Sequence, residues 1–400
     1  MQPTRSYSIG STIWTRDQMT NSVQRGVVTF ASVVGLLLTA LAWNKAGGNL
    51  GLLVLVGVFA GFALYMSSFG FAHSWRQVFG RRRSVGVRAQ IVMLGLTIAA
   101  FFPLLGQGAV LGKSVSGFIN PVGLALCLGA FLFGIGMQLG GGCGSGTLYT
   151  VGGGNSRTAV TLIAFIFGSV VATANPFDWL HWPSLGEMSL IDAFGVPWAL
   201  VISLGALVII YVLLLRFETA EHHSAQPLFN IARMRPLRGP WPLVVGAMAL
   251  ALVNTLTLLL IGRPWGITNA FALWGAKVGI FFGFDIPQWD YWRGDPSLSA
   301  SVLQDPTSLM DLAIIVGAFG AAGMMGQYRP QRKMPLRLLA ASILGGILMG
   351  IGARLGTGCN IGAFFSGTAS GSLHGVIWLV FALPGNMIGA RFRRFFGMGD

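Results

Sequence analysis

Two of the three cysteines in this chain lie in the same glycine-rich pattern. The stretch FGIGMQLGGGCGSG (133–146) ends a long apolar run around Cys143, and MGIGARLGTGCNIG (349–362) does the same around Cys359, 216 positions later. When the last thirteen residues of the two stretches are aligned without a gap, eight are identical. A duplicated glycine–cysteine turn at the ends of two apolar runs indicates an internal repeat and a candidate functional site.

The chemistry available at these turns is the recognition of a small anion. Glycine permits unusual backbone dihedral angles and lets a ligand approach the bare peptide group. A short helix that begins after each turn presents N–H groups without intrahelical partners, which favours an anion. A thiol adds a weak hydrogen-bond donor and a polarisable sulfur atom. The residues expected to line a substrate path at the two turns are Gly141, Gly142, Cys143, Ser145, Arg354, Gly358, Cys359 and Asn360.

Some of these residues have more specific expected roles, and each has a structural alternative. Ser145 and Thr147 supply hydroxyl groups that can cap the short helix. Arg354, one turn before Cys359, either adds positive charge to the path or extends to the outer membrane interface. Glycines in membrane helices also serve close packing, and a buried cysteine also serves as small apolar filler. Cys127, which has no counterpart in the second stretch, is interpreted as filler.

The composition is that of a multi-pass membrane protein. The 400 residues are 54% hydrophobic and 10% charged, against about 25% charged residues in soluble domains. The net charge of +14 comes from clusters such as RRRS (81–84) between apolar runs. Such clusters are interpreted as topology signals beside membrane lipid and not as a nucleic-acid surface. The cysteine spacing fits neither a disulfide framework nor a metal site, and no cofactor is expected.

Ten membrane helices are predicted, with both termini in the cytoplasm of a bacterial cell and the helices in its inner membrane. Residues 1–26 are polar, lack a signal-peptide design and are expected to form a cytoplasmic N-terminal segment. This orientation places 20 of the 26 Lys and Arg inside, and eight of the 12 acids, Asp311 among them, outside. No acid is expected at the centre of a membrane helix. The expected helices are 27–44, 50–68, 88–109, 120–140, 157–175, 195–216, 240–262, 309–326, 336–355 and 373–391.

Shorter segments between these helices are predicted to be re-entrant half-helices. They cover about 70–80, 143–152, 266–283 and 359–368, and each begins at a glycine turn, including turns at Gly70 and Gly266. Irregular backbone at membrane depth is tolerated where it lines an interior path. These two glycines therefore join the expected path.

The order of long and short segments predicts two inverted repeat units. The first unit covers about 50–175 and begins outside, whereas the second lies within 240–395 and begins inside. Inverted units with broken helices that meet near the midplane are a common transporter plan. The expected domain organisation is the N-terminal segment 1–26, a first membrane half 27–216, a cytoplasmic linker 217–239 and a second membrane half 240–395.

At these residues the sequence resembles the YeeE/YedE family of sulfur-transport membrane proteins. GGILMGIGARLGTGCNIGAFFSG (345–367) is similar to the family's second Gly–Cys segment, and FGIGMQLGGGCGSGTLY (133–149) is similar to its first. The resemblance extends loosely over about 50–395. It implies an all-α inverted-repeat fold whose half-helices pinch a central path, with thiosulfate taken up from the periplasm. It also implies a relay of the anion between cysteines, two of which correspond to Cys143 and Cys359.

One departure from the family pattern affects the expected substrate. The family's first short segment usually carries a further cysteine, separated from an arginine by five residues. Here GFAHSWR keeps Arg76 but has Gly70 at that position, so either two thiols suffice or the substrate differs. Some relatives are linked to selenium or other sulfur compounds. Relatives are also linked to small cytoplasmic sulfur carriers of the TusA type, and such a carrier is the expected protein partner.

Three functions stay open at this point. The interpretation adopted is a transporter, not an enzyme, that imports a small sulfur-containing anion, with thiosulfate as the first candidate. The second is a passive anion or small-solute channel whose cysteines are structural. The third is a membrane thiol redox or sulfur-transfer protein. Cysteine substitutions that abolish uptake favour the first, flux that persists after Cys→Ser favours the second, and a persulfide on either cysteine favours the third.

Overall fold

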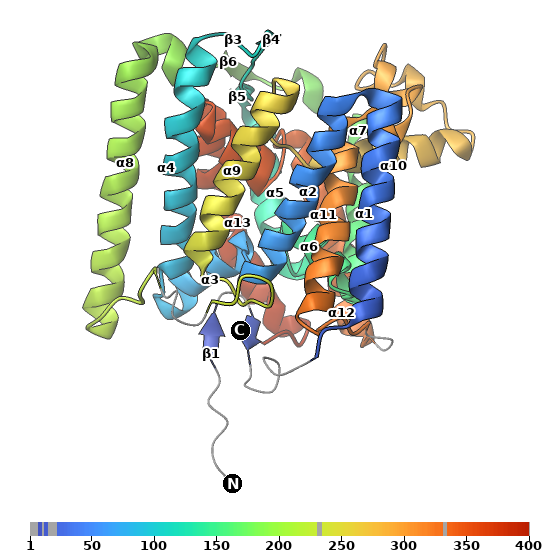
Figure 1. Cartoon of the computed structure of the whole chain (residues 1–400). Coiled ribbons are helices and arrows are strands. Elements are labelled where there is room, and N and C mark those ends of the chain that lie inside the picture. Colours follow the sequence, from blue (N-terminus) through green and yellow to red (C-terminus); the bar gives the residue numbers. More distant parts are fainter. Residues whose placement is uncertain (1–6, 10–11, 15–21, 230–233, 331–333, 400) are drawn as a thin grey trace.

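Long helices run side by side between two faces of the molecule (Figure 1). The computed structural model describes residues 7–9, 12–14, 22–229, 234–330 and 334–399. Ten stretches in these ranges are long and apolar enough to cross a membrane, so the ten predicted spans are confirmed. The long helices are α1 Arg25–Ala46, α2 Gly48–Ser67, α4 Val85–Gly106, α5 Leu124–Gly140, α7 Ser156–Thr173, α8 Leu190–His222, α9 Leu243–Ile261, α11 Pro306–Met324, α12 Leu336–Leu355 and α13 Leu373–Phe395.

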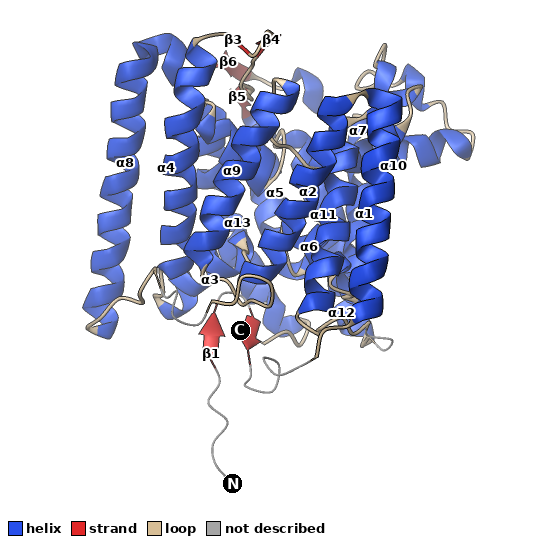
Figure 2. Ribbon diagram, in the orientation of Figure 1, coloured by secondary structure: helices blue, strands red, loops and turns tan. Residues whose placement is uncertain are grey.

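Short helices lie at the four segments that were predicted not to span. They are α3 Phe71–Arg81, α6 Gly144–Gly152, α10 Thr268–Phe281 and the π-helix η7 Asn360–Gly367. Strands in the described residues form three two-stranded antiparallel pairs (Figure 2): β1 Tyr7–Ile9 with β2 Thr12–Trp14, β3 Ala109–Val110 with β4 Lys113–Ser114, and β5 Pro121–Gly123 with β6 Ser184–Glu187. Helical turns η2 Trp179–His181, η4 Ile286–Gln288, η5 Pro296–Leu298 and η6 Val302–Gln304 lie in connections.

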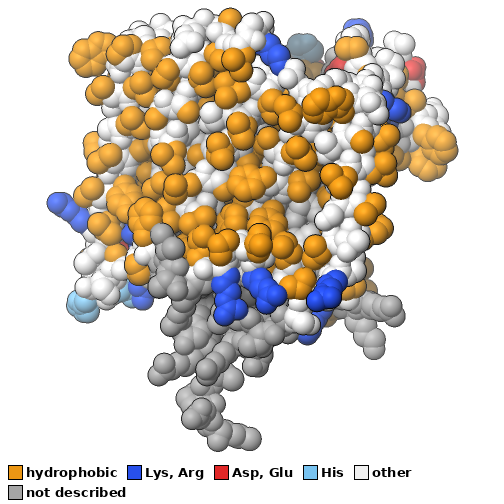
Figure 3. Space-filling model, viewed as in Figure 1, with side chains coloured by type: hydrophobic (Ala, Val, Ile, Leu, Met, Phe, Trp, Pro, Cys, Tyr) orange, Lys and Arg blue, Asp and Glu red, His pale blue; other side chains and the backbone are white. Residues whose placement is uncertain are grey.

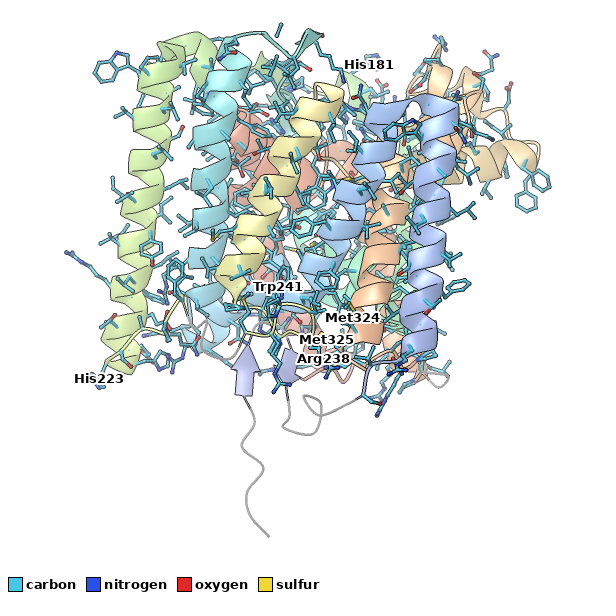
Figure 4. The ribbon with its side chains drawn as sticks, in the orientation of Figure 1. His181, His223, Arg238, Trp241, Met324 and Met325 are labelled. Atoms are coloured by element: carbon cyan, nitrogen blue, oxygen red, sulfur yellow. The ribbon has the colours of Figure 1, made fainter. Side chains whose placement is uncertain are left out.

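The two faces of the molecule carry different elements. The C-terminal face is formed by the starts of α1 and α12 and the ends of α11 and α13, and the opposite hairpin face carries β3–β6 (Figure 1). Hydrophobic side chains cover the middle of the visible surface, whereas Lys and Arg gather along its lower edge, at the C-terminal face (Figure 3). Near that edge Trp241 packs with Met325 before the chain enters α9 (Figure 4).

The helices that precede the two Gly–Cys turns cross at the centre of the molecule. α5 packs against α12, α5 also packs against α13, and α12 also packs against α7. A Cβ atom at Gly136 would lie 2.7 Å from the carbonyl oxygen of Gly345, and one at Gly352 would lie 2.6 Å from that of Gly129. Gly352 follows Gly136 by 216 positions, and Gly345 follows Gly129 by the same number. The contact that α5 makes with α12 is therefore repeated by the equivalent residues of α12 on α5.

The predicted termini and linker are described only in part. Residues 1–6, 10–11 and 15–21 of the expected N-terminal segment, and 230–233 of the expected linker 217–239, lie outside the described residues. Helix α8 continues to His222, so the stretch expected to begin the linker is still helical.

A buried ion pair anchors α8 to the connection between α3 and α4. Glu218 is fully buried and accepts hydrogen bonds from the Ser84 hydroxyl (2.6 Å) and from the Arg88 guanidinium (3.1 Å). Arg83 is a further partner of the same carboxylate, at 3.5 Å. The basic run RRRS was interpreted only as a topology signal, but part of it also holds α8 in place.

Candidate functional site

The four glycine turns predicted to line the path converge in the structure. The Cys143 thiol faces the backbone N–H groups of Gly146 and of Phe71, the residue after Gly70. A Cβ atom built on Gly144 would lie 3.2 Å from Cys359 Sγ and 3.5 Å from Ile267 Cγ2. Gly266 also lies against the start of η7, because a Cβ built on Gly362 would lie 3.9 Å from the Cα of Gly266. The starts of α3, α6, α10 and η7 therefore meet around the two thiols.

Both thiols are sealed from solvent in this structure. Cys143 is 1% exposed and Cys359 is 0% exposed. The Cys143 sulfur lies 3.4 Å from the Ser145 hydroxyl oxygen, and the Ile361 N–H donates to the Cys359 sulfur at 3.4 Å. Each buried thiol thus contacts a polar group of its own short helix.

The Asn360 side chain is the clearest sign of a ligand at the turns. It follows Cys359 at the first position of η7 and is fully buried. Neither its amide nitrogen nor its amide oxygen has a hydrogen-bond partner among the described residues. Since buried polar groups are nearly always paired, this amide next to Cys359 is a candidate ligand-binding group.

The remaining residues of the two turns shape the backbone and do not cap helices. The prediction that Ser145 and Thr147 cap α6 is wrong, because the N-cap residue is Cys143 and Thr147 Oγ1 donates to the Cys143 carbonyl oxygen (2.8 Å). Gly141, with φ +89°, ends α5 at an exposed position beside Arg157.

Two further glycines lie closer to the thiols. Gly142 is half-buried and packs on Gly146. Gly358 has φ +148°, and a Cβ there would lie 2.7 Å from the Ala363 nitrogen, so the second turn requires glycine at this position.

Arg354 lies inside the protein. It is 4% exposed and donates to Thr268 Oγ1 (2.7 Å), Asn269 Oδ1 (2.8 Å) and the Tyr291 hydroxyl (2.9 Å). Its guanidinium therefore connects the end of α12 to the start of α10. This burial favours the interpretation in which Arg354 adds positive charge to the interior.

Gln138 occupies the position that matches Arg354 in the first repeated stretch. Its amide nitrogen donates to the Ala72 carbonyl oxygen (2.8 Å), and its amide oxygen accepts from Arg76 (2.8 Å). Gln138 thus connects the end of α5 to α3, as Arg354 connects α12 to α10. The alignment of the two repeated stretches pairs Gln138 with Arg354. Because one residue is an amide and the other is a cation, the sequence did not indicate that both connect a long helix to a short one.

Sequence reasoning missed a buried acid, Asp311. It was counted among the acids on the outer side, near the start of the expected helix 309–326, yet it lies within α11, is fully buried, and neither carboxyl oxygen has a hydrogen-bond partner among the described residues. The error came from starting this helix at 309. Asp305 caps α11 and Pro306 is its first residue, and an Asp–Pro pair is a recognised helix start.

The described ranges hold no group of three His, Cys, Asp or Glu side chains that could bind a metal ion. Ten apolar helices long enough to cross a membrane define a multi-pass membrane protein. The sequence profile of the sulphur transport family matches residues 66–388. This chain belongs to that family, which consists of transporters and not of enzymes.

Three similar proteins agree with this assignment. The thiosulfate transporter TsuA of Spirochaeta thermophila is 28% identical over 356 residues, which is 83% of this chain and 96% of that protein. TsuA of Escherichia coli is 24% identical over 356 residues and covers 83% and 91% of the two chains. The probable transporter YedE of Escherichia coli is 32% identical over 155 residues, or 38% of each chain.

Proposed function

We propose that this protein imports a small sulfur-containing anion, with thiosulfate as the first candidate, across the bacterial inner membrane. The observation that carries the proposal is the meeting of two buried thiols, Cys143 and Cys359, beside the unpaired amide of Asn360. Two relatives that align over most of their length are named thiosulfate transporters. The family and the chemistry of the turns therefore point to the same class of substrate.

The proposed constriction, where the two Gly–Cys turns meet, is suited to brief, weak contacts with an anion. Taking a charged group out of water is costly unless hydrogen bonds replace the lost hydration. The thiols, the Asn360 amide and the N–H groups at the starts of α6 and η7 supply such donors. A thiol is a weak donor, so an anion held between Cys359 and Cys143 passes on and is not trapped.

The proposed path runs through two inverted repeat units with re-entrant short helices. Three observations support this arrangement: the reciprocal glycine contacts between α5 and α12, the matching packing of α7 on α12 and α13 on α5, and the matching braces at Gln138 and Arg354. In this arrangement 27–216 and 240–395 are the two membrane halves, joined by 217–239. The positive-inside rule places the C-terminal face in the cytoplasm.

The proposal assigns the relay to two thiols. Gly70, which stands where the family usually has a third cysteine, lies next to Phe71, whose N–H faces the Cys143 thiol. Gly70 supplies no side-chain donor, so the proposed relay uses the two thiols alone. A TusA-type carrier at the cytoplasmic face, and lipid at the basic loops, stay predictions.

Radiolabelled thiosulfate uptake tests the proposal. Cells that lack other sulfur-anion importers receive the wild type, Cys143→Ala, Cys359→Ala or, as the matched control, Cys127→Ala, a half-buried cysteine within α5. Uptake by the wild type and Cys127→Ala alone supports the thiol relay. Normal uptake by both turn variants contradicts it and favours a channel. No uptake by the wild type contradicts thiosulfate as the substrate and directs the search to other sulfur or selenium anions.

A further inference from the structure

A basic pocket lies between α3 and α13. Its volume is about 460 Å³, and it is lined by Arg76 and Arg81 of α3 and by Asn386, Arg391 and Arg394 of α13, among others. The described lining residues include no acidic side chain. Four guanidinium groups around one pocket attract anions, and their planar forks match the oxygens of a tetrahedral oxyanion.

Asn386 is an independent sign that this pocket holds a ligand. Asn386 is one of the residues that line the pocket, and its side chain is fully buried beside it. Neither its amide nitrogen nor its amide oxygen has a hydrogen-bond partner among the described residues. An unpaired buried amide is costly, and an oxyanion in the pocket would accept a hydrogen bond from its N–H group.

Helix α3 connects the pocket to the cysteine turns. Its first residue, Phe71, presents its N–H to the Cys143 thiol, and Arg76 follows five residues later, a rise of about 8 Å along the helix axis. Gln138 accepts from Arg76 at 2.8 Å, and His73 Nδ1 lies 3.1 Å from another guanidinium nitrogen of Arg76. The guanidinium is therefore held between the constriction and the pocket.

We propose that this pocket is an exit site, which binds the transported sulfur oxyanion after the anion leaves the Cys143 turn. The inference rests on the proposed function, because that function places the pocket on the cytoplasmic side. A phosphate of an anionic lipid headgroup has the same chemistry. The contact of Arg76 with Gln138, next to the turns, favours the transported anion as the occupant.

Equilibrium binding of radiolabelled thiosulfate tests the exit site. The full chain, with both turn cysteines replaced by alanine, is placed in nanodiscs of zwitterionic phosphatidylcholine. Asn386→Asp or Arg391→Gln is then added, and Arg337→Gln, an exposed arginine outside the pocket, is the matched control. We expect this double-alanine protein to bind, Arg337→Gln to bind equally, and each pocket substitution to weaken binding by about tenfold or more, which corresponds to about 1.4 kcal/mol.

Three results would overturn the exit site. They are unchanged binding in both pocket variants, loss of binding in the double-alanine protein, and displacement of thiosulfate when phosphatidylglycerol is included in the nanodiscs. The last result would assign the pocket to lipid. Because Arg391 is exposed, its substitution still tests the pocket if Asn386→Asp fails to fold. Failure of the proposed function has a different signature, namely thiosulfate uptake by cells that carry the double-alanine protein.

Discussion

A methyl group added at Gly144 would fill the space between the two turns without unfolding the protein. Gly144 is the first residue of α6, and a Cβ there would lie 3.2 Å from Cys359 Sγ and 3.5 Å from Ile267 Cγ2. The methyl group would thus contact the Cys359 thiol on the side that faces the turn around Cys143. We expect Gly144→Ala to fold and to lose uptake.

Gly144→Ala is expected to change the free energy of unfolding less than it changes the rate of uptake. Replacing glycine by alanine within a helix contributes about 1 kcal/mol of stability. The contact with Cys359 Sγ is slightly tighter than ordinary van der Waals contact, and such overpacking costs about 1–3 kcal/mol. The net change in the free energy of unfolding is therefore small. A blocked thiol, by contrast, lowers uptake by about tenfold or more, since each factor of ten is about 1.4 kcal/mol in the barrier.

The assay compares Gly144→Ala with Gly205→Ala. A Cβ at Gly205, within α8, meets no atom within 4 Å, so the control makes the same chemical change in open space. Melting temperature in detergent and thiosulfate uptake at equal membrane expression are measured for both. If Gly144→Ala transports as fast as Gly205→Ala, the passage does not run between the Cys359 thiol and the first turn, and the reasoning is refuted.

Four further substitutions test the packing. Glu218→Ala leaves Arg88 without its buried partner and is expected to lower the free energy of unfolding by about 3–5 kcal/mol. An unchanged denaturant midpoint would contradict the conclusion that this ion pair holds α8 in place. Gly136→Ala and Gly352→Ala each place a Cβ against a carbonyl of the facing helix. Each is expected to lower the free energy of unfolding by about 1–3 kcal/mol. Widely different losses in thermal unfolding would show that the two contacts between α5 and α12 are not equivalent. Asp311→Asn is expected to change stability by less than about 1 kcal/mol, because a carboxyl group and an amide have nearly the same shape and the carboxyl has no hydrogen-bond partner among the described residues. A large loss in thermal unfolding would show that the carboxyl has a specific partner.

The sequence predicted the long helices well because apolar length alone decides them. Each of the ten expected spans corresponds to one observed helix, since a membrane requires about 20 apolar residues in a row. The short helices were found for a related reason. A glycine or Gly–Cys turn interrupts an apolar run in each case, and η7 begins one residue from its expected start at 359.

The contacts between side chains could not be predicted in the same way. The position of Arg354 was known, but its partners Thr268 and Asn269 come from a distant segment. The two unpaired amides, Asn360 and Asn386, are ordinary asparagines in the sequence and are distinguished only by burial. Asp311 was misplaced because helix starts are set by capping residues, which hydropathy ignores.

The most direct test of the central claim is thiosulfate flux through the purified protein. Proteoliposomes are loaded with the wild type, Cys143→Ala, Cys359→Ala or Cys127→Ala, and entry of radiolabelled thiosulfate is followed in parallel with entry of chloride. The relay through the two buried thiols predicts thiosulfate entry for the wild type and Cys127→Ala, and none for the two turn variants. Equal thiosulfate entry in all four proteins would contradict the claim that the thiols carry the substrate.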